Sequence, residues 1–131
     1  MSSRRFPWIF AAAISGFLAV ALGAFGAHAL ASRVDASLLE AYRTGVLYHL
    51  VHSVAILGCG LFLLTHDERR IHHAAGYFLA GIVLFSGSLY IMTVTGARWL
   101  GAVTPFGGIA FLSGWVQLAV AGWRVSRRSS L

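Results

Sequence analysis

Four long apolar stretches, separated by short clusters of charged residues, decide what this chain can fold into. Each stretch reaches the roughly 20 apolar residues that a helix needs to cross a bilayer. Inside lipid the backbone must satisfy its own hydrogen bonds, and a helix does so within one segment. The sequence therefore predicts an all-α protein, a bundle of four transmembrane helices joined by short loops. The predicted spans are 7–31, 44–65, 72–95 and 105–123.

The composition supports lipid as the main solvent. Hydrophobic residues make up 58% of the 131 residues and charged residues only 11%, whereas a soluble domain is about one quarter charged. No linker, Pro-rich stretch or low-complexity tract divides the sequence, so we expect a single integral membrane domain over 1–131. The single cysteine, Cys59, lies in an apolar run and says nothing about the redox compartment.

The net charge of +6 comes from ten arginines grouped at the ends of the apolar stretches. A nucleic-acid-binding face would interleave basic and aromatic residues, so no nucleic acid is predicted. The expected partners are the lipid bilayer and anionic lipid head groups. Positive charge is retained on the cytoplasmic side, and the predicted topology groups the arginines seven against three, with both termini cytoplasmic. The seven are Arg4, Arg5, Arg69, Arg70, Arg124, Arg127 and Arg128; the three are Arg33, Arg43 and Arg98.

Two helix starts carry local signals. Ser37 and Glu40 have the spacing of a capping box, with Asp35 adding negative charge before it. The second helix should therefore begin outside the hydrocarbon. Thr104 followed by Pro105 predicts an N-cap and a proline at the first helical position of the fourth helix.

The first apolar stretch allows two interpretations. Arg4 and Arg5, an apolar run and Ala29-Leu30-Ala31 resemble a secretory signal with its cleavage site. The apolar run is longer than the usual signal core of 7 to 15 residues, and cleavage would remove one helix of the bundle. We therefore predict that this helix is retained.

Polar residues within the spans are the candidate functional residues, because ionisable side chains inside a membrane are costly. Gly45, His49, His52, Ile56 and Cys59 follow a three-four spacing, so both histidines should face the bundle interior. At 1.5 Å per residue they should lie roughly 5 to 12 Å below the outer boundary. The third and fourth helices should bring further polar groups to this depth. The candidate ligand-binding residues are His28, His49, His52, Ser88, Tyr90 and Thr104.

This polar cluster has two interpretations. Three imidazoles could ligate a metal or haem iron, or line a quinone site, and the identity of any metal stays unknown. However, a His-x-x-His pair is common, and no carboxylate or thiolate is expected at the same depth. Buried polar groups in hydrocarbon need partners, which favours a hydrogen-bonded cluster that ties the helices together. No catalytic residue and no cofactor are predicted.

Several motifs resemble one known family. They are Gly23-Ala24-Phe25-Gly26-Ala27-His28, Tyr42-Arg43-Thr44-Gly45 with Tyr48, His49 and His52, Phe85-Ser86-Gly87-Ser88-Leu89-Tyr90, Thr104-Pro105-Phe106-Gly107-Gly108 and Gly114-Trp115. In this order they are similar to the bacterial inner-membrane family known as domain of unknown function 423, to which animal transmembrane protein 256 is related. The resemblance covers nearly the whole chain. It implies a small multi-pass protein of the bacterial inner (plasma) membrane, with no assigned activity and no catalytic roles to carry over.

Two functional hypotheses follow from the sequence. The first is a non-enzymatic component of the membrane that acts by packing, by forming a homo-oligomer or by accompanying a larger complex. The second is a membrane-embedded binding or redox site for a metal, a haem or a quinone, built from the histidines. The short predicted loops favour the first.

Overall fold

The computed structural model describes residues 6–130, in which all regular secondary structure is helical. Four helical rods are long and apolar enough to cross a membrane, at Trp8–Leu30, Ala36–Phe62, Arg69–Thr95 and Arg98–Ser129. These confirm the predicted all-α fold with four spans. The elements are α1 (Trp8–Phe25), π-helix η1 (Gly26–Leu30), α2 (Ala36–Phe62), α3 (Arg69–Gly81), π-helix η2 (Ile82–Ser86), α4 (Gly87–Thr95), 3-10 helix η3 (Arg98–Ala102) and α5 (Thr104–Ser129).

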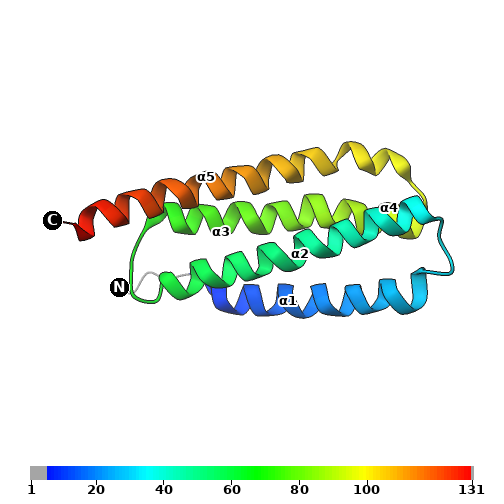
Figure 1. Ribbon diagram of the computed structural model, residues 1–131, viewed down its shortest axis with the longest axis horizontal. Helices are drawn as coiled ribbons and strands as arrows, with labels where there is room; N and C mark the ends of the chain where they lie inside the picture. The colour runs from blue at the N-terminus through cyan, green and yellow to red at the C-terminus, as the bar shows by residue number, and fades with distance from the viewer. Residues whose placement is uncertain (1–5, 131) are drawn as a thin grey trace.

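The rods form two antiparallel hairpins that lie side by side (Figure 1). The first hairpin is α1 against α2, and the second is the α3–η2–α4 rod against α5. The hairpins meet mainly where α2 packs along α3, η2 and α4. As a result α1 and α5 are the outer rods, and the two inner rods carry more of the buried surface.

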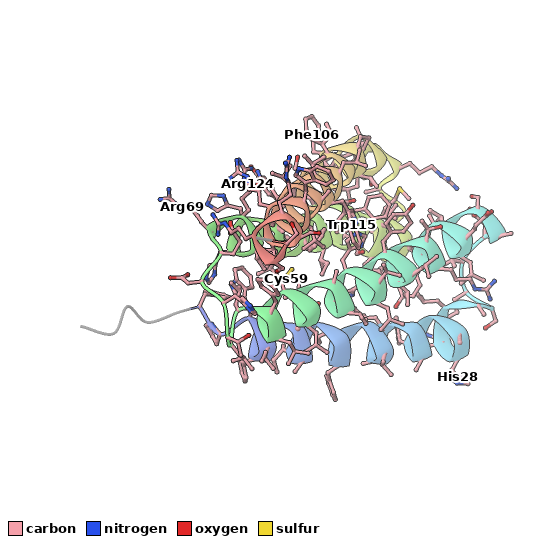
Figure 2. All side chains as sticks on the ribbon, turned by 60° about the vertical axis from the view of Figure 1, so that its left-hand side comes forward. His28, Cys59, Arg69, Phe106, Trp115 and Arg124 are labelled. Atoms are coloured by element: carbon pink, nitrogen blue, oxygen red, sulfur yellow. The ribbon has the colours of Figure 1, made fainter. Side chains whose placement is uncertain are left out.

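The described arginines fall at the two ends of the rods, as the sequence predicts. We call these the Arg69 end, where α2 joins α3 and α5 finishes, and the Arg98 end, where α1 joins α2 (Figures 1 and 2). Arg69, Arg70, Arg124, Arg127 and Arg128 belong to the first, and Arg33, Arg43 and Arg98 to the second. Arg4 and Arg5 lie outside the described residues. The cytoplasmic location of the Arg69 end stays a prediction.

Large apolar side chains lie both inside the bundle and around it. Phe78 and Ile56 are fully buried between the rods, while Phe10, Phe17 and Leu112 are among many that are exposed on the outside. In water such a surface would drive association. In a bilayer it is the surface that contacts the acyl chains, so the burial pattern agrees with four membrane-spanning rods.

The starts of α2 and α5 differ from the predicted caps. Asp35, and not Ser37, is the N-cap of α2: its carboxylate accepts the Leu38 N–H at 2.9 Å. Ser37 already lies in the helix and donates its hydroxyl to Asp35 at 2.6 Å, so the predicted capping box is wrong. At α5 the N-cap is Val103, without a side-chain cap. Thr104 is the first helical residue and its hydroxyl is used elsewhere, so its predicted capping role is also wrong.

The Asp35 cap makes stability depend on acid pH. The Ser37 hydroxyl, followed by the Leu38 N–H and the nearby Arg98 guanidinium, lowers the pKa of this carboxyl from its usual value of 3.8. A lowered folded-state pKa gives stability that is present above the unfolded pKa and is lost as pH falls through the folded value. Asn at position 35 can still cap the helix but carries no charge. We expect wild type to unfold at higher temperature than Asp35→Asn at pH 6, and the difference to shrink below about pH 4. A difference that stays constant down to pH 2.5 would contradict this assignment.

Candidate functional site

His49 and His52 are buried at the centre of α2, and each is only 4% exposed. His49 lies thirteen residues from either end of α2, about 20 Å at 1.5 Å per residue. The predicted inward direction of both histidines is therefore confirmed. Their expected depth of 5 to 12 Å below the outer boundary stays a prediction.

His49 belongs to a chain of hydrogen bonds that joins three rods. Its Nε2 lies 3.1 Å from the Ser15 hydroxyl of α1, and its Nδ1 lies 2.8 Å from the Tyr90 hydroxyl of α4. The Ser15 hydroxyl also lies 2.6 Å from that of Ser53, and Ser53 donates to the His49 carbonyl at 2.7 Å. One side chain of α2 thus connects α1 and α4 at the middle of the bundle.

The donor and the acceptor of each hydrogen bond in this series follow from the number of hydrogens that each side chain carries. Ser53 uses its single hydrogen on the His49 carbonyl, so Ser15 must donate to Ser53. Ser15 therefore accepts from His49 Nε2–H, and in a neutral ring Nδ1 accepts from the Tyr90 hydroxyl. A neutral ring is expected here, because an unpaired charge at this depth is costly. The chain ends on a backbone carbonyl, which is not a base that could pass a proton onward.

His52 ties α2 to α5 in a second, separate arrangement. Its Nδ1 lies 2.7 Å from the Tyr48 carbonyl and must donate to it. The Trp115 indole N–H, which is only a donor, gives its hydrogen to His52 Nε2 at 3.1 Å. The imidazole is therefore neutral, with both nitrogens occupied. Its ring stacks on Phe111 at a centroid distance of 3.7 Å, which adds a second contact with α5.

Hydroxyl-to-backbone bonds hold the remaining rods in register. Ser86 of η2 donates to the Gly45 carbonyl of α2 at 2.6 Å, and Tyr42 of α2 donates to the Leu22 carbonyl of α1. Thr93 of α4 lies 3.1 Å from the Leu38 carbonyl of α2. These bonds are buried or partly buried, and each stabilises a contact between neighbouring rods.

The six predicted site residues do not form one cluster. His49 and Tyr90 meet, whereas His52 binds Trp115 instead. Ser88 and Thr104 pair with each other at 2.7 Å between α4 and α5. His28 is exposed in η1, and Figure 2 shows it at the Arg98 end, pointing away from the helices and far from Trp115. The sequence stripe on α2 could not reveal Ser15 or Trp115, which lie on other rods. Ser53 follows His49 by four residues on the same face of α2, so the spacing could have included it.

The donor groups present do not assemble into a metal site. Within residues 6–130 no group of three or more His, Cys, Asp or Glu side chains is placed to hold a metal ion. Both nitrogens of His49 and of His52 already have hydrogen-bond partners, so ligation would require breaking them. Buried side-chain polar atoms of the described residues all have partners as well. The arrangement has the properties of a structural network.

The Arg69 end has its own ties between rods. The Trp8 indole N–H of α1 donates to His72 Nδ1 of α3 at 3.0 Å, and Arg70 of α3 donates to Gln117 of α5 at 2.9 Å. Trp8 is thereby one of the few points where α1 is held to a rod other than α2.

Comparison with known families gives one match. The family described as a protein of unknown function (DUF423) matches residues 22–108. That segment contains η1, the whole of α2, the α3–η2–α4 rod and the start of α5. His49, His52 and Tyr90 therefore all lie within the matched part of the chain.

Individual relatives cover nearly the full length. UPF0382 membrane protein YwdK of Bacillus subtilis is 43% identical over 120 residues, 87% of this chain and 94% of that protein. UPF0382 inner membrane protein YgdD of Escherichia coli K12 is 41% identical over 124 residues, 95% of this chain and 94% of that protein. A UPF0382 membrane protein of Haemophilus influenzae is 39% identical over 112 residues. No solved structure matches the chain.

Proposed function

The chain belongs to the DUF423 family of unknown function, and from that premise we propose that it is a small accessory component of the bacterial inner membrane. In this proposal the protein has no enzymatic activity of its own and acts by packing against other copies or against a larger membrane complex. The relatives named as membrane and inner membrane proteins support the location.

The proposal rests on the hydrogen-bond partners of the two buried histidines. His49 and His52 spend all four ring nitrogens on bonds that join or brace the rods. An active site needs groups free to bind and exchange protons with a substrate. The His49 chain instead ends on a backbone carbonyl, so its hydrogen bonds support architecture.

The exposed surface indicates where partners would bind. The connections at 31–35 and 63–68 are short, so most of the described surface belongs to the spans. The outer rods α1 and α5 expose Phe17 and Leu112 at 71% and 67%. Contacts with another protein would therefore form through these rods, within the bilayer. The arginines at both ends would bind anionic lipid head groups.

Photo-crosslinking in native membranes tests the proposal. A photoreactive residue replaces Phe17 on α1 or Leu112 on α5, and the matched control replaces Ile56, which is fully buried. At least one outer position should give a discrete crosslinked species at native expression level, and Ile56 should give none. A further copy and a different membrane protein are distinguished by mass. If both outer positions give only the uncrosslinked monomer, the accessory role is contradicted.

A further inference from the structure

A lateral groove runs between the two hairpins on one side of α2. Its walls are Phe10 and Ile14 of α1 and Val83 and Ile91 of the α3–η2–α4 rod. All four are more than 45% exposed, so the groove is open to the acyl chains of a bilayer. Its volume is about 690 Å³, within the range of 300 to 1,000 Å³ typical of small-molecule sites. The groove exists because α1 packs chiefly on α2 and diverges from the rod beyond it.

The lining of the groove is apolar except for the His49 chain. Ser15, His49 and Tyr90 contribute the polar part of the lining. His49 lies thirteen residues from either end of α2, about 20 Å from both. Arg43, the last charged residue before His49 on α2, lies six residues earlier, about 9 Å along the helix, so these groups lie within the hydrocarbon core. A phospholipid that brought its charged head group to this depth would have to strip it of water, which is too costly. The polar end of a ligand that reaches this depth must be uncharged.

The direction of the His49 chain defines which partner the groove can accept. Tyr90 donates its hydrogen to His49 Nδ1, so its oxygen retains lone pairs that can only accept. Ser86 lies near this phenol, but it donates its hydrogen to the Gly45 carbonyl at 2.6 Å. No other donor within the described chain is bonded to the Tyr90 oxygen. The groove therefore offers an acceptor, and it favours a ligand with an O–H group.

We propose that this groove binds a lipid-soluble hydroquinone, with a quinol hydroxyl donating to the Tyr90 oxygen and its apolar tail lying between α1 and the α3–η2–α4 rod. A quinol is uncharged, so it can enter the hydrocarbon core at the depth of Tyr90. Its aromatic ring can pack against the exposed Phe10 ring in the groove wall, which an aliphatic alcohol cannot do as favourably. The oxidised quinone has only carbonyl acceptors and would face the Tyr90 oxygen without a hydrogen bond. This inference goes beyond the accessory role and does not depend on it.

Binding of the two redox forms tests the proposal. The full chain in nanodiscs is titrated anaerobically with a ubiquinol analogue that has a ten-carbon tail, and separately with its quinone form. We expect the quinol to bind about tenfold more tightly, the difference that one hydrogen bond makes. Dodecanol serves as the aliphatic comparison and should bind more weakly than the quinol.

Three variants locate the site. The double variant Tyr90→Phe with His49→Leu removes the phenol oxygen and also the His49 Nδ1 acceptor that Tyr90→Phe alone would expose, so it should abolish the preference for quinol and leave quinone affinity unchanged. Val83→Trp fills the groove and should weaken both forms, whereas Val116→Trp, equally exposed on α5, should weaken neither. Thermal unfolding confirms that each variant is folded. Equal affinity of wild type for quinol and quinone, unchanged binding in Val83→Trp, dodecanol binding as tight as quinol, or no binding of any probe would each overturn the proposal.

Discussion

Replacing Gly107 with alanine should lower the free energy of unfolding by about 1 to 3 kcal/mol, the usual cost of adding volume to a packed interior. A Cβ at this position would lie 2.6 Å from the Phe85 Cβ and 2.7 Å from its Cα. The obstacle is mainly the backbone of η2, which cannot rotate away as a side chain can. The change therefore forces α5 away from η2.

The adjacent Gly108 provides a matched control. A Cβ at Gly108 meets nothing within 4 Å, and both glycines lie in the first turns of α5. Each Gly→Ala change gains similar helix propensity, roughly 0.5 to 1 kcal/mol, so the difference between the variants isolates the contact with Phe85. Unfolding in mixed micelles should show Gly107→Ala destabilised and Gly108→Ala neutral or stabilised. Equal stability of the two variants would show that α5 does not approach η2 at Gly107.

Replacing His49 with leucine should lower the free energy of unfolding by about 1 to 3 kcal/mol, because it leaves polar partners buried without their hydrogen bonds. The Tyr90 hydroxyl loses its acceptor and the Ser15 hydroxyl loses a donor. Leucine fills similar space without polar atoms, so the loss reflects the hydrogen bonds and not a cavity. Thermal unfolding in detergent measures it.

A second substitution distinguishes the network from the packing of the ring. If the His49–Tyr90 bond is the cause, Tyr90→Phe should lower the free energy of unfolding less in the His49→Leu background than in wild type. In that background the Tyr90 hydroxyl is already unpaired, so removing it loses no hydrogen bond. Strictly additive losses would mean that the two side chains do not interact, and would contradict the hydrogen-bond chain.

The four spans were predictable from the sequence because lipid imposes a simple rule on the backbone. An apolar stretch of sufficient length favours a helix in the bilayer, and the structure has four helical rods long and apolar enough to span it. The helix ends were less predictable. Asp35 takes the capping role assigned to Ser37, because this aspartate, two residues earlier, offers a carboxylate to the Leu38 N–H. Such competition between neighbouring caps is decided by local geometry.

The candidate site was predictable only within one helix. The three-four spacing places His49 and His52 on the buried face of α2, because periodicity within a helix is a property of the sequence. Their partners depend on how far one rod is shifted along the next. Ser15 meets Ser53, and Trp115 meets His52, through that register.

His28 was expected near the other histidines and lies apart from them. It belongs to η1, a π-helix over Gly26–Leu30. Ser15 is the residue of α1 that meets His49, and His28 lies thirteen residues further along the rod, about 20 Å at 1.5 Å per residue. The sequence did not show at which level of α1 the histidines of α2 would lie.

If the buried histidines hold the rods together, the His52 imidazole and the Trp115 indole should be energetically coupled. Unfolding free energies are measured for wild type, His52→Leu, Trp115→Phe and the double variant, with and without a chelator. We expect His52→Leu to lower the free energy of unfolding by on the order of 1 kcal/mol, and the cycle to give a coupling of about 0.6 kcal/mol, as for interhelical hydrogen bonds in membranes. Both values should be the same in chelator. A coupling of zero, or a stability of wild type that falls in chelator to that of His52→Leu, would contradict the claim and assign His52 to a metal site.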